Sequence, residues 1–144
     1  MRIAVGNDHR GLPLKLELLP LLKAAGHEVV DLGAGVETSV DYPDFGSEVA
    51  RRVSRGEADR GILICGTGIG MAITANKAPG VRASIVPDAA TVAVSRKHNN
   101  LNVLCLGEKQ APDAAAIVQA FLETEFEGGR HADRVAKITA FERG

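Results

Sequence analysis

The sequence predicts an α/β fold in three layers, with helices on both faces of a five-stranded parallel sheet. Short runs of apolar, β-branched residues recur five times along the chain, and a helical pattern follows each of them. The runs are apolar nearly throughout and do not alternate, which is typical of strands covered on both faces. The chain has 144 residues and shows no linker, repeat or low-complexity segment. We therefore expect a single domain over residues 1–144.

The five apolar runs predict the strands, in order, at Arg2–Gly6, Glu28–Leu32, Gly61–Cys65, Val81–Val86 and Asn102–Leu106. Repeated strand–helix units require right-handed crossovers, so a doubly wound sheet is the expected arrangement. The pattern leaves the order of the strands within that sheet open.

The first two helices are predicted from apolar stripes at helical spacing. The first stripe consists of four leucines, Leu14, Leu18, Leu21 and Leu22. Pro20 lies inside this stripe and should kink or split the helix, and Gly26 can end it. Asp41 can cap the second helix, which should end before Gly56 and carries on one face Phe45, Val49 and Val53.

Four further helices complete the pattern. The third should begin within Gly66–Gly70, Asp88 can cap the fourth, and Pro112 can open the fifth. The last helix should cover about residues 131–141, after a glycine hinge at residues 127–129. From there it could pack on a partner subunit.

Composition and charge exclude several classes of function. The net charge is −1 and aromatic residues make up 3% of the chain, so neither nucleic acid nor an anionic membrane is expected as a partner. No apolar run approaches the roughly 20 residues that cross a bilayer, and the amino terminus does not resemble a signal peptide. The two cysteines, Cys65 and Cys105, are expected to be free thiols in a cytoplasmic protein.

Polar side chains gather where the predicted strands end, the edge at which open α/β sheets bind ligands. Asp8 and His9 follow the first strand, the loop Gly66–Gly70 follows the third, and Lys109 follows the fifth. A carboxylate such as Asp8 can hold sugar hydroxyls, and a histidine such as His9 can bind phosphate or move protons. We therefore expect a functional site at this edge.

Cys65 ends an apolar strand and enters a loop with three glycines, Gly66, Gly68 and Gly70. The amide N–H groups of such a loop stabilise negative charge, so they favour a thiolate. A thiolate there can take a proton from carbon while the amides hold the oxyanion that develops. The alternative is that Cys65 is only a small buried residue and that the glycines form a tight turn. For Cys105 we favour the interpretation as a buried core residue.

The glycine loop is also compatible with a nucleotide-binding module that has no catalytic activity. Gly66 and Gly68 satisfy the first half of the dinucleotide fingerprint, and Asp88 lies near the distance expected for a ribose contact. Met71 stands where the third glycine is required, and no Walker lysine follows the loop. A purely structural interaction domain is a third hypothesis.

Two further polar clusters lie at the ends of predicted helices. Arg130, His131 and Arg134 fall within one helical turn, and two guanidinium groups on one helix face suit the geometry of phosphate. The alternative is a solvated basic helix end. His98 and Asn99 end the fourth helix, where His98 could serve only as a cap with a favourable dipole contact.

Taken together, these segments resemble the ribose-5-phosphate isomerase type B family, which includes allose-6-phosphate and galactose-6-phosphate isomerases. The resemblance extends from residue 3 to about residue 140. It rests on Gly6–His9, Asp41–Pro43, Gly61–Gly70, Asn76–Ala83, His98–Asn99 with Asn102–Leu104, and Glu127–His131 with Arg134. It implies a Rossmann-like sheet, no cofactor and no metal. It also implies a phosphorylated sugar as substrate, and a homodimer or tetramer with active sites at the subunit interface.

The resemblance further implies the reaction and the role of each residue. D-Ribose 5-phosphate and D-ribulose 5-phosphate would interconvert through a cis-enediolate in pentose phosphate metabolism. Cys65 would carry the proton between C1 and C2, Thr67 and the glycine-loop amides would assist the enediolate, and His98 would help to open the furanose ring. The residues expected to bind substrate are Asp8, His9, Tyr42, Gly66, Gly68, Gly70, Asn99, Lys109, Arg130, His131 and Arg134.

The sequence departs from the family at two positions. Lys109 stands where many members carry an arginine in the phosphate site, and it offers a point charge in place of a planar fork. Asn7 stands where many members have cysteine or another small residue.

Other features bear on the branch of the family and on the substrate. One branch uses a carboxylate as base a few residues after the cysteine position. Residues 71–74 here contain no acid, so the thiol branch fits. The galactose-6-phosphate subunits usually lack both the His98–Asn99 pair and the Gly-Gly-Arg-His segment at residues 128–131. Allose 6-phosphate, galactose 6-phosphate and a tetrose phosphate remain alternative substrates, since the sequence does not measure the size of a pocket.

Overall fold

The computed structural model describes residues 1–144. Its five strands are parallel and lie in the order β2-β1-β3-β5-β4. They are β1 (Arg2–Asn7), β2 (Glu28–Asp31), β3 (Arg60–Ile64), β4 (Ala83–Ile85) and β5 (Val103–Leu106). The α-helices are α1 (Leu12–Ala24), α2 (Tyr42–Ser54), α3 (Ile69–Ala75), α4 (Ala89–Asn99), α5 (Ala114–Glu123) and α6 (Arg130–Glu142), and η1 (Glu108–Asp113) is a 3₁₀ helix.

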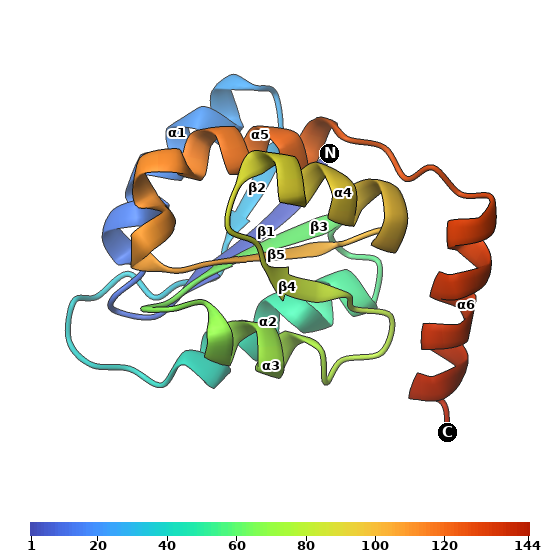
Figure 1. The fold of residues 1–144 in the computed structure, drawn as a ribbon. Helices are drawn as coiled ribbons and strands as arrows, with labels where there is room; N and C mark the ends of the chain where they lie inside the picture. Colours follow the sequence, from blue (N-terminus) through green and yellow to red (C-terminus); the bar gives the residue numbers. More distant parts are fainter.

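The predicted three-layer α/β architecture is confirmed. Helices α1, α4 and α5 cover one face of the sheet, and α2 and α3 cover the other (Figure 1). Alternate strand residues point to the two layers, so that Ile62 and Ile64 pack with the first set of helices and Leu63 packs with the second. Both clusters are closed to solvent, which explains why the strands are apolar nearly throughout.

The three central strands end together. Asn7 of β1 pairs in register with Ile64 of β3, and Ile64 pairs in turn with Leu106 of β5. The loops that follow these strands therefore meet at a single edge of the sheet, which we call the carboxyl edge. The opposite edge, where the strands begin, is called the amino edge.

Some details of the predicted elements were wrong. Helix α1 runs unbroken through Pro20, so the proline does not split it, and Leu21 is half exposed instead of joining the core stripe. Pro112 does not open a helix, because it lies inside η1, and α5 begins at Ala114. Asp41 occupies the N-cap position of α2 without a side-chain hydrogen bond. Asp88 does cap α4, since its carboxylate accepts the N–H of Thr91 at 2.7 Å.

Helix α6 stands apart from the body of the protein, beside the end of α4 (Figure 1). Its only buried residue is His131. The preceding linker is held to α4 by hydrogen bonds from the Arg96 guanidinium to the Thr124 carbonyl and from the Glu127 N–H to the Lys97 carbonyl. No helix combines the length and the apolar character that crossing a membrane requires.

Candidate active site

Cys65 lies directly after β3 at the carboxyl edge. Its Sγ accepts the backbone N–H of Gly68 at 3.1 Å, and a hydrogen bond donated to sulfur stabilises the thiolate. Gly68 has a φ of +82° and lies close to the Leu106 carbonyl, so the turn requires a residue without a side chain. Cys65 is 5% exposed. The side chain packs in the buried cluster between the sheet and helices α2 and α3.

Thr67 and the ends of the loop complete a polar rim around the thiol. Thr67 is exposed, and its Oγ1 accepts the N–H of Ile69 at 3.2 Å. The backbone of Thr67 packs so closely on Gly107 that a Cβ at position 107 would lie 2.7 Å from the Thr67 carbonyl oxygen. The ring of Tyr42 covers Gly70 and leaves no room for a Cβ there. The glycines at 68, 70 and 107 are thus needed for the close packing of three chain segments.

Sequence reasoning did not single out the ion pair that closes this rim. The guanidinium of Arg10 donates from Nε and from the terminal nitrogen to both carboxylate oxygens of Glu108, at 3.0 and 2.7 Å. It lies over Gly66, where a Cβ would be 2.9 Å from Cζ. Each charge favours the ionised form of the other, so the pKa of Glu108 is lowered and that of Arg10 is raised. Arg10 directly follows His9, and Glu108 directly precedes Lys109. Their places after β1 and β5 were therefore visible in the sequence, but their pairing was not.

Asp8, His9 and Lys109 lie at the same edge, as predicted. The Oδ1 of Asp8 accepts the backbone N–H groups of Arg10 and Gly11, each at 3.0 Å, so the carboxylate is fixed at the start of α1. The Nδ1 of His9 accepts the N–H of Val40 at 3.2 Å. Lys109 is exposed in η1, after β5.

The structure accounts for Asn7. Its side chain is fully buried and donates from Nδ2 to the carbonyls of Asp8 and Ala34, at 2.8 and 2.9 Å. Lys15, also buried, donates from Nζ to the same Ala34 carbonyl and to Asp31, both at 3.0 Å. The Asn7 and Lys15 side chains thus hold the end of β1 and the start of α1 against the segment after β2. That segment continues to Val40, whose N–H donates to His9.

The second predicted group lies at the amino edge. Since α4 connects two parallel strands, β4 and β5, it runs back across the sheet, and His98 and Asn99 at its end lie where β5 begins (Figure 1). Arg130, His131 and Arg134 open α6 beside them. The structure therefore separates the predicted residues, with Cys65 and its neighbours at one edge and the basic cluster at the other.

His98 and His131 form a stacked pair in which the ring centroids are 4.1 Å apart and the planes differ by 12°. His131 is 4% exposed, and its Nε2 is buried with no hydrogen-bond partner. Burial lowers the pKa of His131, and the neighbouring His98 and Arg130 lower it further. The structure thus buries His131 against His98, and its expected part in substrate binding stays a prediction.

One group of side chains in the protein can hold a metal ion. The ligand atoms of His98, Glu127 and His131 all lie within 4.8 Å of one another, and the His131 Nε2 lies 3.6 Å from a carboxylate oxygen of Glu127. This group is at the amino edge and does not include Cys65.

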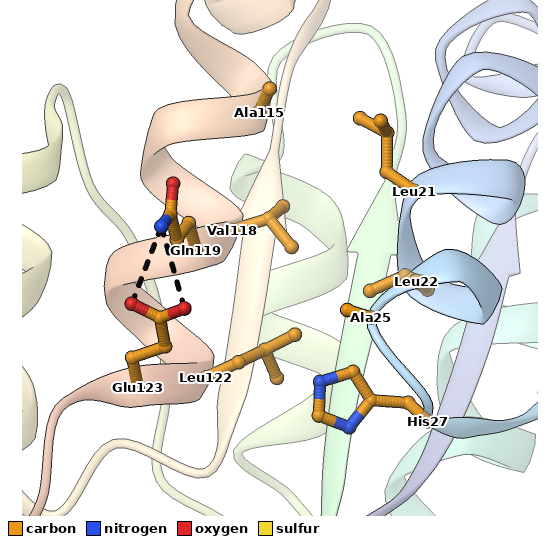
Figure 2. A pocket seen from close by; sticks show the side chains of 9 residues that line it. All are labelled: Leu21, Leu22, Ala25, His27, Ala115, Val118, Gln119, Leu122 and Glu123. Atoms are coloured by element: carbon orange, nitrogen blue, oxygen red, sulfur yellow. Dashed lines mark hydrogen bonds between the residues drawn. The ribbon is translucent and has the colours of Figure 1, made fainter.

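Two hollows in the surface lie away from the thiol loop. One of about 260 Å³ opens between α1 and α5, with His27 at its rim and an apolar lining that includes Leu22, Val118 and Leu122 (Figure 2). Another, of about 550 Å³, separates α6 from the body and is lined by Arg82, Asn99 and Phe141. Neither contains Cys65 or Thr67. Cys105 is wholly buried among core residues, and this burial raises the pKa of its thiol, so its predicted role as core is confirmed.

A thiol that accepts a backbone N–H at the carboxyl edge of a doubly wound sheet, with a separate basic cluster at the amino edge, is the arrangement expected of an α/β enzyme of the sugar-phosphate isomerase class. Comparison with known proteins supports this class. Residues 3–138 match the Ribose/Galactose Isomerase family, and the chain belongs to that family.

Individual relatives agree over nearly the whole chain. Ribose-5-phosphate isomerase B of Escherichia coli is 45% identical over 99% of this chain and 97% of its own. The structure of ribose-5-phosphate isomerase B from Clostridium thermocellum is 50% identical, with a TM-score of 0.96 over 99% of this chain and 98% of that one. The Mycoplasma genitalium enzyme, determined with bound ribulose-5-phosphate, is 43% identical, with a TM-score of 0.94 over 99% and 96% of the two chains.

Proposed function

We propose that this protein interconverts D-ribose 5-phosphate and D-ribulose 5-phosphate. The observation that carries the proposal is the hydrogen bond from the Gly68 N–H to the Cys65 sulfur, because it fixes the sulfur beside the loop amides at the edge where ligands of such sheets bind. The likeness to a relative determined with bound ribulose-5-phosphate, at 43% identity, supports the choice of substrate.

In the proposed reaction, the Cys65 thiolate removes the proton from C2 of the open-chain aldose. The electron pair of the C2–H bond forms the C1–C2 double bond, and the aldehyde oxygen takes up the negative charge of the cis-enediolate. Thr67 and the loop amides stabilise that charge. The C2 hydroxyl proton then passes to the C1 oxygen, the C2 carbonyl forms, and the electron pair of the C1–C2 double bond takes a proton from the Cys65 thiol at C1, which restores the thiolate. Atoms and charge balance without an external oxidant or cofactor.

The separation of the two predicted groups leads us to propose that each active site is shared between two copies of the chain. One copy supplies Cys65, Thr67, Asp8 and His9, and the second supplies His98 and Asn99 with Arg130 and Arg134. His98 opens the furanose ring, and the two arginines bind the phosphate in a bidentate manner. Binding the remote phosphate positions C1 and C2 at the thiolate. The oligomer is a dimer or a tetramer of such pairs.

The exposed apolar residues of α6 favour the same arrangement. Ile138 is 50% exposed and Phe141 is 87% exposed, and no other part of the chain covers them. Ile69 and Ile73 of α3 are also more than half exposed, and α3 begins at the thiol loop. Apolar faces of this kind mark subunit contacts.

The decisive experiment is a turnover assay with a panel of aldose phosphates, with and without a chelator. We expect the highest kcat/KM with ribose 5-phosphate, no effect of the chelator, and loss of nearly all turnover in Cys65→Ala while substrate still binds. Cys105→Ala is the matched control, because it removes a thiol from the core and leaves the site intact. Wild-type rates in purified Cys65→Ala would show that the thiol assignment is wrong.

Galactose 6-phosphate and allose 6-phosphate belong in the panel, because the matched family includes galactose isomerases. ATP and NAD belong in a parallel binding assay. Saturable nucleotide binding without sugar-phosphate turnover would favour a nucleotide-binding module. We place the enzyme in the pentose phosphate pathway of the cytoplasm on the strength of the family resemblance.

A further inference from the structure

Three potential metal ligands converge where α4 ends and α6 begins. His98 comes from the last turn of α4, Glu127 from the linker, and His131 from the first turn of α6, and their ligand atoms lie within 4.8 Å of one another. The linker is fixed against α4 by the 3.1 Å hydrogen bond from the Glu127 N–H to the Lys97 carbonyl. The three groups are therefore held together by the fold.

An unsatisfied atom points into this group. The Nε2 of His131 is inaccessible to solvent and has no hydrogen-bond partner, and its nearest charged neighbour is the Glu127 carboxylate at 3.6 Å. Buried ring nitrogens in folded proteins are nearly always paired. The orphaned nitrogen is therefore a free ligand atom next to a second imidazole and a carboxylate.

We propose that His98, Glu127 and His131 bind Zn²⁺ and that the bound ion inhibits the enzyme. Two imidazoles and one carboxylate form a ligand set that zinc takes in proteins. In the stacked pair the rings are nearly parallel, so their in-plane lone pairs cannot meet at one ion. His98 is half-exposed and has to turn out of the stack, which removes it from ring opening. The inhibitory part rests on the proposed function of His98.

The surrounding charges determine the expected affinity of the site for Zn²⁺. Arg130 and Arg134 lie in the same turn of α6 and oppose a cation, whereas Glu127 attracts it. The site should therefore bind zinc reversibly and more weakly than a structural zinc centre, and substrate phosphate held by the two arginines should not displace it directly.

Binding is tested by calorimetric titration of the full-length protein with Zn²⁺. A Cys65→Ser background removes the catalytic thiol as a competing ligand. We expect one ion per chain, binding at least about tenfold weaker after Glu127→Gln, and unchanged binding after the matched control Glu125→Gln. Co²⁺ bound to the protein with Cys65 intact should show no sulfur-to-metal charge-transfer band. Equal zinc affinity of Glu127→Gln and its parent, or an affinity that depends on Cys65, would overturn the proposal.

Inhibition is tested separately on enzyme with Cys65 intact. Glu127→Gln should match wild-type turnover without metal and should need at least about tenfold more Zn²⁺ for half inhibition, and EDTA should restore activity. Inhibition that is unchanged in Glu127→Gln overturns the inhibitory role. If metal-free wild type shows no turnover, the proposed isomerase function is contradicted. The zinc site is judged separately, because the titration measures its dependence on Glu127 without any assay of turnover.

Discussion

Asn7 and Ala34 are 27 positions apart in the sequence, and a 2.9 Å hydrogen bond from the Asn7 Nδ2 to the Ala34 carbonyl joins them at the end of β1. The side chain that makes this bond is fully buried. It adds to the two backbone hydrogen bonds by which Asn7 already pairs with Gly33 and Ala34, in the segment after β2. The departure from the family at position 7 therefore has a structural role.

Asn7→Ala is expected to lower the free energy of unfolding by about 1 kcal/mol, because two buried hydrogen bonds are lost while the Asp8 carbonyl keeps the Gly11 N–H and the Ala34 carbonyl keeps the Lys15 Nζ. Urea denaturation measures the change. Gln119→Ala, an exposed helical site whose side chain hydrogen-bonds only to Glu123, should change stability by less than about 0.5 kcal/mol. A similar effect of both substitutions would remove the role assigned to the Asn7 amide.

Arg134→Ala is expected to raise KM for the sugar phosphate at least about tenfold, because one of two guanidinium anchors for the phosphate is lost. Lys137→Ala is the matched control, since it removes a positive charge from the next turn of the same exposed helix. Steady-state kinetics on the two variants distinguish a specific phosphate contact from a general loss of charge. An unchanged KM in Arg134→Ala removes this residue from the phosphate site.

Mixing two inactive variants tests whether each site is shared. Cys65→Ala damages the carboxyl-edge half of a site, and His98→Asn damages the half supplied by the second copy. In a mixed dimer, one site carries both changes and the other carries neither. After co-refolding in equal amounts, activity should recover to about a quarter of the wild-type value, because half of the dimers are mixed and each has one intact site. No recovery, despite exchange of subunits shown by mass, would mean that each site is built within one chain.

The sequence predicted the layers well for a physical reason. Strands such as β3 are buried on both faces, so their apolar runs are continuous, and the helices show local periodicity that needs no knowledge of the fold. Asp88 was identified as a cap because capping is also local. The thiol loop was predicted because its glycines and its place after a strand are both visible in the chain.

What sequence reasoning could not supply depends on long-range pairing. The position of β5 between β3 and β4 follows from packing of whole elements. The Arg10–Glu108 pair joins residues 98 positions apart, and the Asn7–Ala34 bond is of the same kind. The stack of His131 on His98 depends on where the linker places α6. Pro112 was misassigned because the same residue fits a helix start and a 3₁₀ turn.

The cap of α4 gives a pH-dependent prediction. The Thr91 N–H donates to the Asp88 carboxylate at 2.7 Å and lowers the pKa of Asp88 in the folded protein. A folded-state pKa below the unfolded value means that the cap contributes its full stability above the unfolded pKa of about 4. The contribution is lost as the pH falls through the folded pKa. Asp88→Ala should therefore lower the urea midpoint at pH 7, and its difference from wild type should shrink steadily below about pH 4.

Asp113→Ala is the matched control for this cap. Asp113 occupies the N-cap position of α5, but its side chain makes no capping hydrogen bond. Its replacement should therefore have a smaller effect at pH 7 than that of Asp88. A difference from wild type that is constant between pH 7 and pH 3 would show that the Asp88 carboxylate does not act as an ionised cap.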